Sequence, residues 1–295
     1  MTKNIININK NVGNITLYVE DNAGNTASSL IVIDPYVQSE LLRSLSDSKE
    51  YVKQGLILYF DGINNTGSGH SSTTTVWKDL SGNNNNGILY GFNYNVNSGW
   101  NQNYLNFNND NSEWGDYILI PSIVNIPAEY TIEFIIKYND YYDKTWHGIS
   151  FIGTRSGLFG GATGDGQTGF EVWGYGSNGN CMLTVKDSLD NIYTNQIGSN
   201  GIIAMNSFKK VTLTKILTNA TIFVNDTKYT KKTFANSINA TVAKTTLIIN
   251  GRSGSGVGGS YQFRGNVYGV RIYNRELTDV EIKQNYIIDI EKYGL

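Results

Sequence analysis

The fold is decided by the stretch Phe263-Arg-Gly-Asn-Val-Tyr-Gly-Val-Arg-Ile-Tyr-Asn274, which is followed by Arg-Glu-Leu-Thr-Asp-Val-Glu-Ile-Lys-Gln-Asn-Tyr286. Its first half alternates with period two and predicts a strand. One predicted face holds Val267, Gly269, Arg271 and Tyr273, and the other holds Asn266, Tyr268, Val270 and Ile272. The second half predicts a short helix, capped by Thr278 with Glu281 three residues on as in a capping box. Its predicted apolar stripe is Val280, Ile282, Tyr286 and Ile287.

Three upstream segments complete the pattern. They are Gly55-Leu-Ile-Leu-Tyr-Phe-Asp61, Trp77-Lys-Asp-Leu-Ser-Gly-Asn-Asn-Asn-Asn-Gly87 and Trp114-Gly-Asp-Tyr-Ile-Leu-Ile-Pro121. In this order, with the C-terminal stretch, they resemble laminin-G-like domains of the concanavalin A-like lectin/glucanase superfamily. The resemblance covers residues 55–295 and implies an all-β fold, in which two antiparallel sheets pack face to face as a jelly-roll sandwich.

Residues 1–34 are predicted to form a small β-hairpin anchoring region. The segment Leu17-Tyr-Val-Glu-Asp-Asn-Ala-Gly-Asn-Thr-Ala-Ser28 is similar to the final hairpin of bacterial immunoglobulin-like domains. Such a lone sheet is marginal in water, so we expect it to pair with another subunit or a larger assembly.

Residues 35–54 are predicted to form a helical neck. Asp34 and Pro35 begin it, Gly55 ends it, and a narrow apolar stripe runs along it. Two interpretations stay open: a linker helix lying against the lectin domain, or a short coiled-coil stalk of three or two chains. We expect residues 1–54 to self-associate into a homotrimer.

Composition excludes several partners. A net charge of -2 with 16% charged residues gives no basic field for nucleic acid. The only cysteine, Cys181, allows no intramolecular disulfide and reads as a packed strand position. No apolar run approaches the roughly 18 residues needed to span a bilayer, and the N-terminus has no signal-peptide pattern.

The strand Phe170-Glu-Val-Trp-Gly-Tyr-Gly176 is the candidate carbohydrate platform. Glu171, Trp173 and Tyr175 alternate onto one face, where aromatic rings can stack on sugars and a carboxylate can accept from hydroxyls. In the family that the chain resembles, the concave sheet and its rim loops bind carbohydrate. This implies further contacts from loop residues, namely Tyr142, Trp146, His147, Arg155 and Arg252. The alternative is that these aromatics only pad the sheet edge.

Catalysis is not expected. Retaining glycosidases of the family carry an E-x-D-x-E or E-x-D-x-x-E strand, and neither Glu133 nor Glu171 begins such a motif. Relatives often hold calcium, and four aspartates stand at family-like positions: Asp61, Asp79, Asp110 and Asp116. The same aspartates could instead satisfy the amides of turns.

The sequence therefore predicts a non-catalytic carbohydrate-binding protein that attaches to bacterial surface glycans. Without an export signal, such a domain most economically reaches glycans on a bacteriophage particle. Lectin-like domains of this kind occur on capsid decorations and tail receptor-binding proteins, so we expect a virion location and contacts of residues 1–54 with other virion proteins. Two alternatives are a purely structural or adhesive protein and, less favoured, a glycoside hydrolase.

Overall fold

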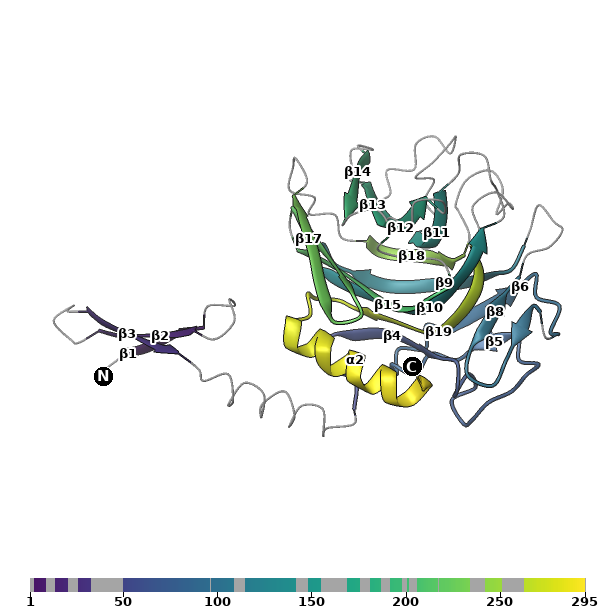
Figure 1. Ribbon diagram of the computed structural model, residues 1–295, viewed down its shortest axis with the longest axis horizontal. Helices are drawn as coiled ribbons and strands as arrows, with labels where there is room; N and C mark the ends of the chain where they lie inside the picture. Colours follow the sequence, from purple (N-terminus) through teal and green to yellow (C-terminus); the bar gives the residue numbers. More distant parts are fainter. Residues whose placement is uncertain are drawn as a thin grey trace. The chain divides into compact units, whose positions relative to one another are not determined.

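The computed structural model describes residues 3–8, 14–20, 26–32, 50–95, 97–108, 115–141, 148–154, 169–175, 181–186, 192–197, 201, 206–216, 218–233, 242–250 and 263–294 (Figure 1). The chain divides into two compact units, Met1–Tyr51 and Val52–Leu295.

The first unit is a small antiparallel sheet. Its strands are β1 (Lys3–Ile8), β2 (Asn14–Glu20) and β3 (Thr26–Val32), in the order β1-β2-β3. The predicted strands are thus present. The predicted helical neck lies outside the described residues up to residue 49. Its last residues are a bend at Glu50, an irregular stretch and a turn that begins at Gln54. The N–H of Val52 donates to Asn285 Oδ1 (3.0 Å).

The second unit is a sandwich of two 8-stranded antiparallel sheets. We call the sheet with the order β17-β16-β15-β10-β19-β8-β7, to which β4 adds beside β19, the back sheet. Its strands are β4 (Leu56–Asp61), β7 (Gly99–Trp100), β8 (Leu105–Phe107), β10 (Tyr130–Tyr141), β15 (Phe208–Ile216), β16 (Asn219–Val224), β17 (Thr227–Thr233) and β19 (Phe263–Tyr273). The front sheet has the order β14-β13-β12-β11-β18-β9-β6-β5. Its strands are β5 (Val76–Trp77), β6 (Gly87–Tyr90), β9 (Tyr117–Ile126), β11 (Gly148–Thr154), β12 (Gly169–Tyr175), β13 (Cys181–Lys186), β14 (Ile192–Ile197) and β18 (Val242–Ile249).

The core lies between the sheets and follows the strand alternation. On β10, Ile132, Phe134 and Ile136 point into the core. The largest fully buried side chain is Trp77, which stacks on Phe60 with ring centroids 5.1 Å apart. Burying such a side chain stabilises the fold by up to about 3 kcal/mol.

The predicted faces of β19 need one correction. Val267 lies in the sandwich core with Val270 and Ile272, whereas Tyr268 packs in a separate cluster on the other side. The reason is a β-bulge, because Ile135 pairs with Gly269 and the next residue of β10 pairs with Val267. An extra residue in one strand reverses the alternation beyond it.

The predicted helix is α2 (Asp279–Tyr293), and its capping box is confirmed. Thr278 Oγ1 accepts from Glu281 N (3.3 Å), and Glu281 Oε2 accepts from Thr278 N (2.8 Å). The predicted apolar stripe is correct only at Ile282. Val280 is 39% exposed, and the buried face is instead Ile282, Asn285, Ile288, Asp289 and Tyr293. Figure 1 shows α2 along the outer side of the back sheet. The buried face of α2 carries two polar side chains because Asn285 bonds to Glu133 and Asp289 bonds to Arg271.

Candidate functional site

The outer face of the back sheet is closed by an ionic network under α2. Glu133 on β10 and Arg271 on β19 are cross-strand partners, and Lys210 comes from β15. Arg271 Nε lies 2.6 Å from Glu133 Oε2, and its Nη1 and Nη2 lie 2.9 and 2.5 Å from the two oxygens of Asp289. Lys210 Nζ is 2.7 Å from Glu133 Oε1. All four side chains have no exposed surface, and two cations balance two carboxylates.

Hydrogen bonds complete this network. Asn285 Nδ2 donates to Glu133 Oε2 (2.9 Å) and to the Tyr273 hydroxyl (2.9 Å). Burial raises the pKa of the Glu133 carboxyl, but the charges and hydrogen bonds of Lys210 and Arg271 outweigh burial and hold that pKa below its ordinary value. A buried ion pair of this kind contributes little net stability, yet removing one partner is costly because a charge is left unpaired. The network is therefore a structural device that fixes α2 on the sheet.

The outer face of the front sheet is built differently. Its register aligns a core row, Val172, Ile152, Ile249, Ile118 and Leu89, on five neighbouring strands. Successive residues of a strand belong to opposite faces. The flanking positions therefore form two rows away from the core: Glu171, Gly153, Ile248, Leu119, Ile88 and Val76, and on the other side Trp173, Ser150, Tyr117 and Tyr90.

This register places the predicted platform only in part. Positions 171 and 173 lie on the outer face of the front sheet, since Val172 is in the core. The side chains of Glu171, Trp173 and Tyr175 are outside the description. The predicted loop contacts also lie outside the described residues: Tyr142, Trp146, His147, Arg155 and Arg252.

A feature that the sequence analysis missed lies at the other end of this face. Tyr90 and Tyr117 are stacked across β6 and β9, with ring centroids 5.0 Å apart and an interplanar angle of 10°. Tyr90 is 39% exposed. The signal in the sequence was the alternation in Gly87-Ile-Leu-Tyr and Tyr117-Ile-Leu-Ile, whose strands are apolar on both faces.

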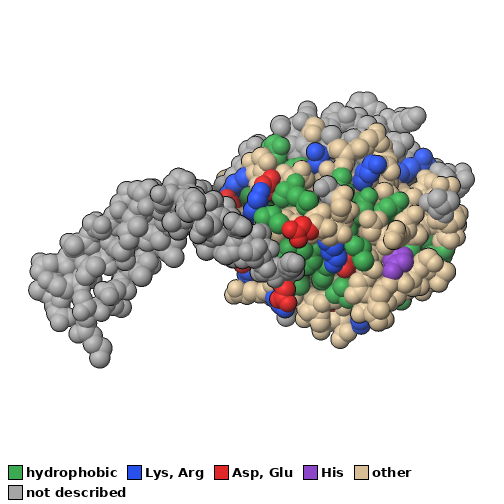
Figure 2. Space-filling view, turned by 60° about the horizontal axis from the view of Figure 1, so that its bottom comes forward, with side chains coloured by type: hydrophobic (Ala, Val, Ile, Leu, Met, Phe, Trp, Pro, Cys, Tyr) green, Lys and Arg blue, Asp and Glu red, His purple; other side chains and the backbone are tan. Residues whose placement is uncertain are grey.

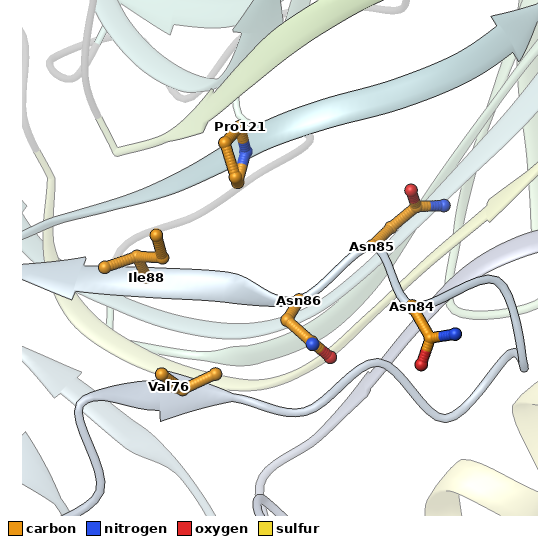
Figure 3. Close-up of a pocket in the computed structure, with 6 residues that line it drawn as sticks. All are labelled: Val76, Asn84, Asn85, Asn86, Ile88 and Pro121. Atoms are coloured by element: carbon orange, nitrogen blue, oxygen red, sulfur yellow. The ribbon is translucent and has the colours of Figure 1, made fainter.

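A pocket of about 330 Å³ opens at β5, β6 and the segment between them. We call it the β5–β6 pocket, and its lining residues are Val76, Asn84, Asn85, Asn86, Ile88 and Pro121 (Figure 3). None of them is charged. In Figure 3 the amides of Asn84 and Asn86 lie on the opposite side of their segment from that of Asn85. Asn85 is buried and donates to Ile57 O (2.7 Å), so it anchors the segment.

Three of the four predicted metal ligands are described, and each accepts hydrogen bonds from nearby groups of the protein. Asp79 accepts from the N–H groups of Tyr59, Ser81 and Asn85 at 2.8 to 3.0 Å. Asp61 accepts from Lys292 Nζ (2.5 Å), and Asp116 accepts from Ser98 Oγ and Asn108 N (2.9 Å each).

These contacts match the alternative of turn-stabilising side chains. Asp110 lies outside the described residues. Within the part that the structure describes, no three His, Cys, Asp or Glu side chains come together to share a metal ion. The calcium site stays a prediction, because calcium also takes backbone and amide carbonyl oxygens as ligands.

Cys181 occupies the predicted packed position. It begins β13, is fully buried, and belongs to the sandwich core. Burial raises the pKa of its thiol to about 12. A thiol of this kind is protonated at neutral pH and unreactive.

The matching family model is described as the concanavalin A-like lectin/glucanases superfamily and covers residues 109–283. The chain belongs to this superfamily. No curated protein sequence gives a significant match. The all-β sandwich expected from the resemblance is therefore confirmed.

Solved structures agree on the fold. A mutant Trypanosoma rangeli sialidase with trans-sialidase activity is 14% identical, with 93% of this chain and 42% of that chain covered and a TM-score of 0.51. The botulinum neurotoxin serotype D binding domain is 13% identical, with 82% and 52% covered and a TM-score of 0.53. The same toxin's ligand binding domain in complex with N-acetylneuraminic acid is 14% identical, with the same coverage and a TM-score of 0.54. This concanavalin A-like chain thus spans about half the length of these proteins.

The surface of the concanavalin A-like unit is mixed in character. On the side drawn in Figure 2, basic and acidic side chains are interspersed with apolar and uncharged polar ones. This agrees with the net charge of -2. Among the helices of the described residues, none has the length and apolar character needed to cross a membrane.

Proposed function

We propose that the Val52–Leu295 unit is a non-catalytic carbohydrate-binding domain whose ligand lies on the outer face of the front sheet. The observation that carries this proposal is the difference between the two outer faces. In the back sheet, α2 and the ionic network cover the outward side chains of Glu133, Lys210 and Arg271, whereas the β5–β6 corner of the front sheet leaves Tyr90 and Val76 exposed. Sugar rings pack their C–H faces on aromatic rings, so an open aromatic sheet face suits a glycan.

The binding residues we propose on this face are those of β12 and its neighbouring loops: Glu171, Trp173, Tyr175, Tyr142, Trp146, His147, Arg155 and Arg252. The register supports the first two, because positions 171 and 173 share cross-sheet rows with exposed apolar residues. A structural neighbour was solved with N-acetylneuraminic acid, which supports glycans as the ligand class.

The absence of catalysis is part of the proposal. Glycoside hydrolysis needs two carboxyl groups facing one bond. Glu133 and Asp289 are both fully buried and paired with Arg271, so neither can meet a substrate. The sequence also lacks the paired-carboxylate strand motif. The sialidase-like fold of one neighbour does not oppose this, since fold alone does not transfer activity.

We further propose display on a bacteriophage particle, as a capsid decoration or a tail receptor-binding protein. Residues 1–54 would form a homotrimer that attaches to other virion proteins. The three-stranded sheet of the first unit supports this, because such a small sheet is marginal on its own. Light scattering of the full chain tests it, and a monomer at micromolar concentration would contradict it.

The test of binding uses the full chain on a glycan array and on bacterial cell walls, with and without calcium. Trp173→Ala should abolish saturable binding. Tyr229→Ala is the matched control, because Tyr229 is an exposed aromatic (39%) on β17 of the back sheet and should leave binding unchanged. Equal binding by the two variants would refute the β12 site. No binding by the wild-type protein at multivalent density would favour the structural or adhesive alternative.

A further inference from the structure

We propose that the Tyr90–Tyr117 pair and the β5–β6 pocket form a second saccharide-binding site, selective for neutral sugars. This inference rests on the proposed function, but it concerns different strands and different side chains. Tyr90 and Val76 are two of the four exposed large hydrophobic residues in the described part of the chain. Both belong to this one corner of the front sheet, which concentrates apolar exposure there.

The tyrosine pair supplies an aromatic platform. The ring of Tyr90 has one face against Tyr117 at 5.0 Å and remains 39% exposed. The supporting ring is half-buried in the sheet, so Tyr90 is held in place and does not have to be ordered on binding. A pre-ordered aromatic ring binds at lower entropic cost than a mobile one.

The pocket supplies the polar partners. Ile88 is two residues from Tyr90 on the same face of β6, which is about 7 Å along the strand. The pocket therefore begins where the tyrosine platform ends. The described hydrogen bonds of Asn84 and Asn86 use only their Oδ1 atoms, which accept from Lys78 Nζ (3.2 Å) and Asp79 N (3.0 Å). Among the described contacts, the Nδ2 groups of Asn84 and Asn86 make no hydrogen bond, so each can donate to a hydroxyl of a ligand.

The backbone holds these amides in place. Asn84 has a positive φ of 59°, and Asn85 fixes the turn through Ile57 O and Asp79 Oδ2. The lining contains apolar groups and amides but no charged side chain. The Lys78 ammonium beside the pocket donates to Asn84 Oδ1 (3.2 Å), and no charged side chain belongs to the lining itself, so the site suits a saccharide that needs no counter-charge.

This site is separate from the one proposed on β12. Ile248 lies between them in the outer row, on β18, and is only 1% exposed. Four strand spacings from β12 to β6 amount to about 19 Å. The two sites are therefore distinct contact areas, and the domain should bind saccharide at both.

The experiment is a nuclear magnetic resonance titration of the full chain with neutral disaccharides and trisaccharides of glucose, galactose, N-acetylglucosamine and arabinose. Two reporters are followed: the ring signals of Tyr90, assigned with Tyr90→Phe, and the indole N–H of Trp173, assigned with Trp173→Phe. We expect saturable shifts of both signals with a neutral saccharide. Tyr90→Ala should weaken binding at the second site by about 2- to 12-fold, the range for one aromatic contact.

Two variants sharpen the assignment. Asn84→Gly keeps a residue that tolerates the left-handed backbone and removes the amide, so it should weaken binding at the Tyr90 reporter only. Tyr229→Ala, on the back sheet with the same 39% exposure, should change neither reporter.

Each outcome separates this inference from the function it rests on. If Trp173 shifts and Tyr90 does not, the second site is refuted and the carbohydrate-binding function stands. If Tyr90 alone shifts, the second site is supported and the β12 assignment is wrong. If neither shifts at millimolar saccharide, both proposals fail. Tyr90 shifts that depend on protein concentration without saccharide would instead mark a contact between copies of the chain and overturn the inference.

Discussion

The outer faces of the two sheets differ in whether their outward side chains are covered by another element. The back sheet carries Glu133, Lys210 and Arg271 outward and covers them with α2, so that none is exposed. The front sheet leaves Tyr90 and Val76 in contact with solvent at its β5–β6 corner.

This difference shows that charged side chains on the outer face of a sheet do not by themselves identify the face that binds a ligand. The most strongly charged cluster in the described residues is structural, because every charge in it is paired inside the protein. The β5–β6 pocket, proposed to bind a neutral saccharide, has no charged side chain in its lining. Variants on each sheet should therefore differ in whether they change stability or binding.

The largest expected effect is on the back sheet. Glu133→Gln leaves Lys210 and Arg271 buried with a single carboxylate, Asp289, and should lower the free energy of unfolding by about 3 to 5 kcal/mol. Urea unfolding followed by tryptophan fluorescence measures this loss.

The control is an exposed ion pair between β17 and the first residue of α2. Lys228 and Asp279 lie 3.1 Å apart with side chains 52% and 57% exposed, so Asp279→Asn should cost no more than about 1 kcal/mol. Equal losses in the two variants would mean that burial of the network has no special role.

A second lysine of β15 sharpens the contrast. Lys215 is buried like Lys210, but its Nζ donates to a backbone oxygen, Ala128 O (2.7 Å). Burial lowers the pKa of Lys215 from 10.5 to about 8, and the charge of Glu129 opposes this only in part. Between these two pKa values the unfolded chain binds more protons than the folded one, so stability should rise with pH.

Lys215→Met removes this titration. Relative to the variant, the wild-type protein should gain about 1 to 2 kcal/mol of stability between pH 8 and 10.5, after allowance for solvent screening. Unfolding free energies of both proteins, measured from pH 8 to 10.5, test whether this relative stability rises with pH. Parallel curves for the two proteins would rule out the proposed cost of burying the Lys215 charge.

A smaller effect is expected at the start of α2. Thr278→Ala removes the side-chain acceptor for Glu281 N and should cost about 1 kcal/mol of stability. Thr278→Ser keeps a hydroxyl and should cost much less. A loss of the same size in both variants would assign the effect to packing instead of capping.

The smallest stability effect should come from the front sheet. Tyr90→Ala removes an exposed side chain, and we expect the melting transition to reflect a change within about 0.5 kcal/mol. A loss above about 2 kcal/mol would mean that the tyrosine pair is a structural element, and its proposed role in binding would lose its main support.

The sequence predicted the framework well because period and capping act locally. The capping box at Thr278 and the packed position of Cys181 are both confirmed.

Features that depend on contacts between residues far apart in the chain could not be predicted from the sequence. The bulge near Gly269 depends on pairing with a strand that lies far away in the chain, so no local period reveals it. Asn285 and Asp289 read as solvent-facing polar residues, since their partners Glu133 and Arg271 meet them only after the sheet forms. The Tyr90–Tyr117 pair likewise exists only through the register of β6 and β9.

The most direct test of this contrast is hydrogen exchange of the full chain, with and without the neutral saccharide that gives the largest shifts in titration. The account predicts added protection in β6, β9 and β12, and no change in α2 or in β10 and β19 beneath it. Protection concentrated in α2, with none on the front sheet, would contradict it, because the ligand would then bind the face that the ionic network is proposed to close.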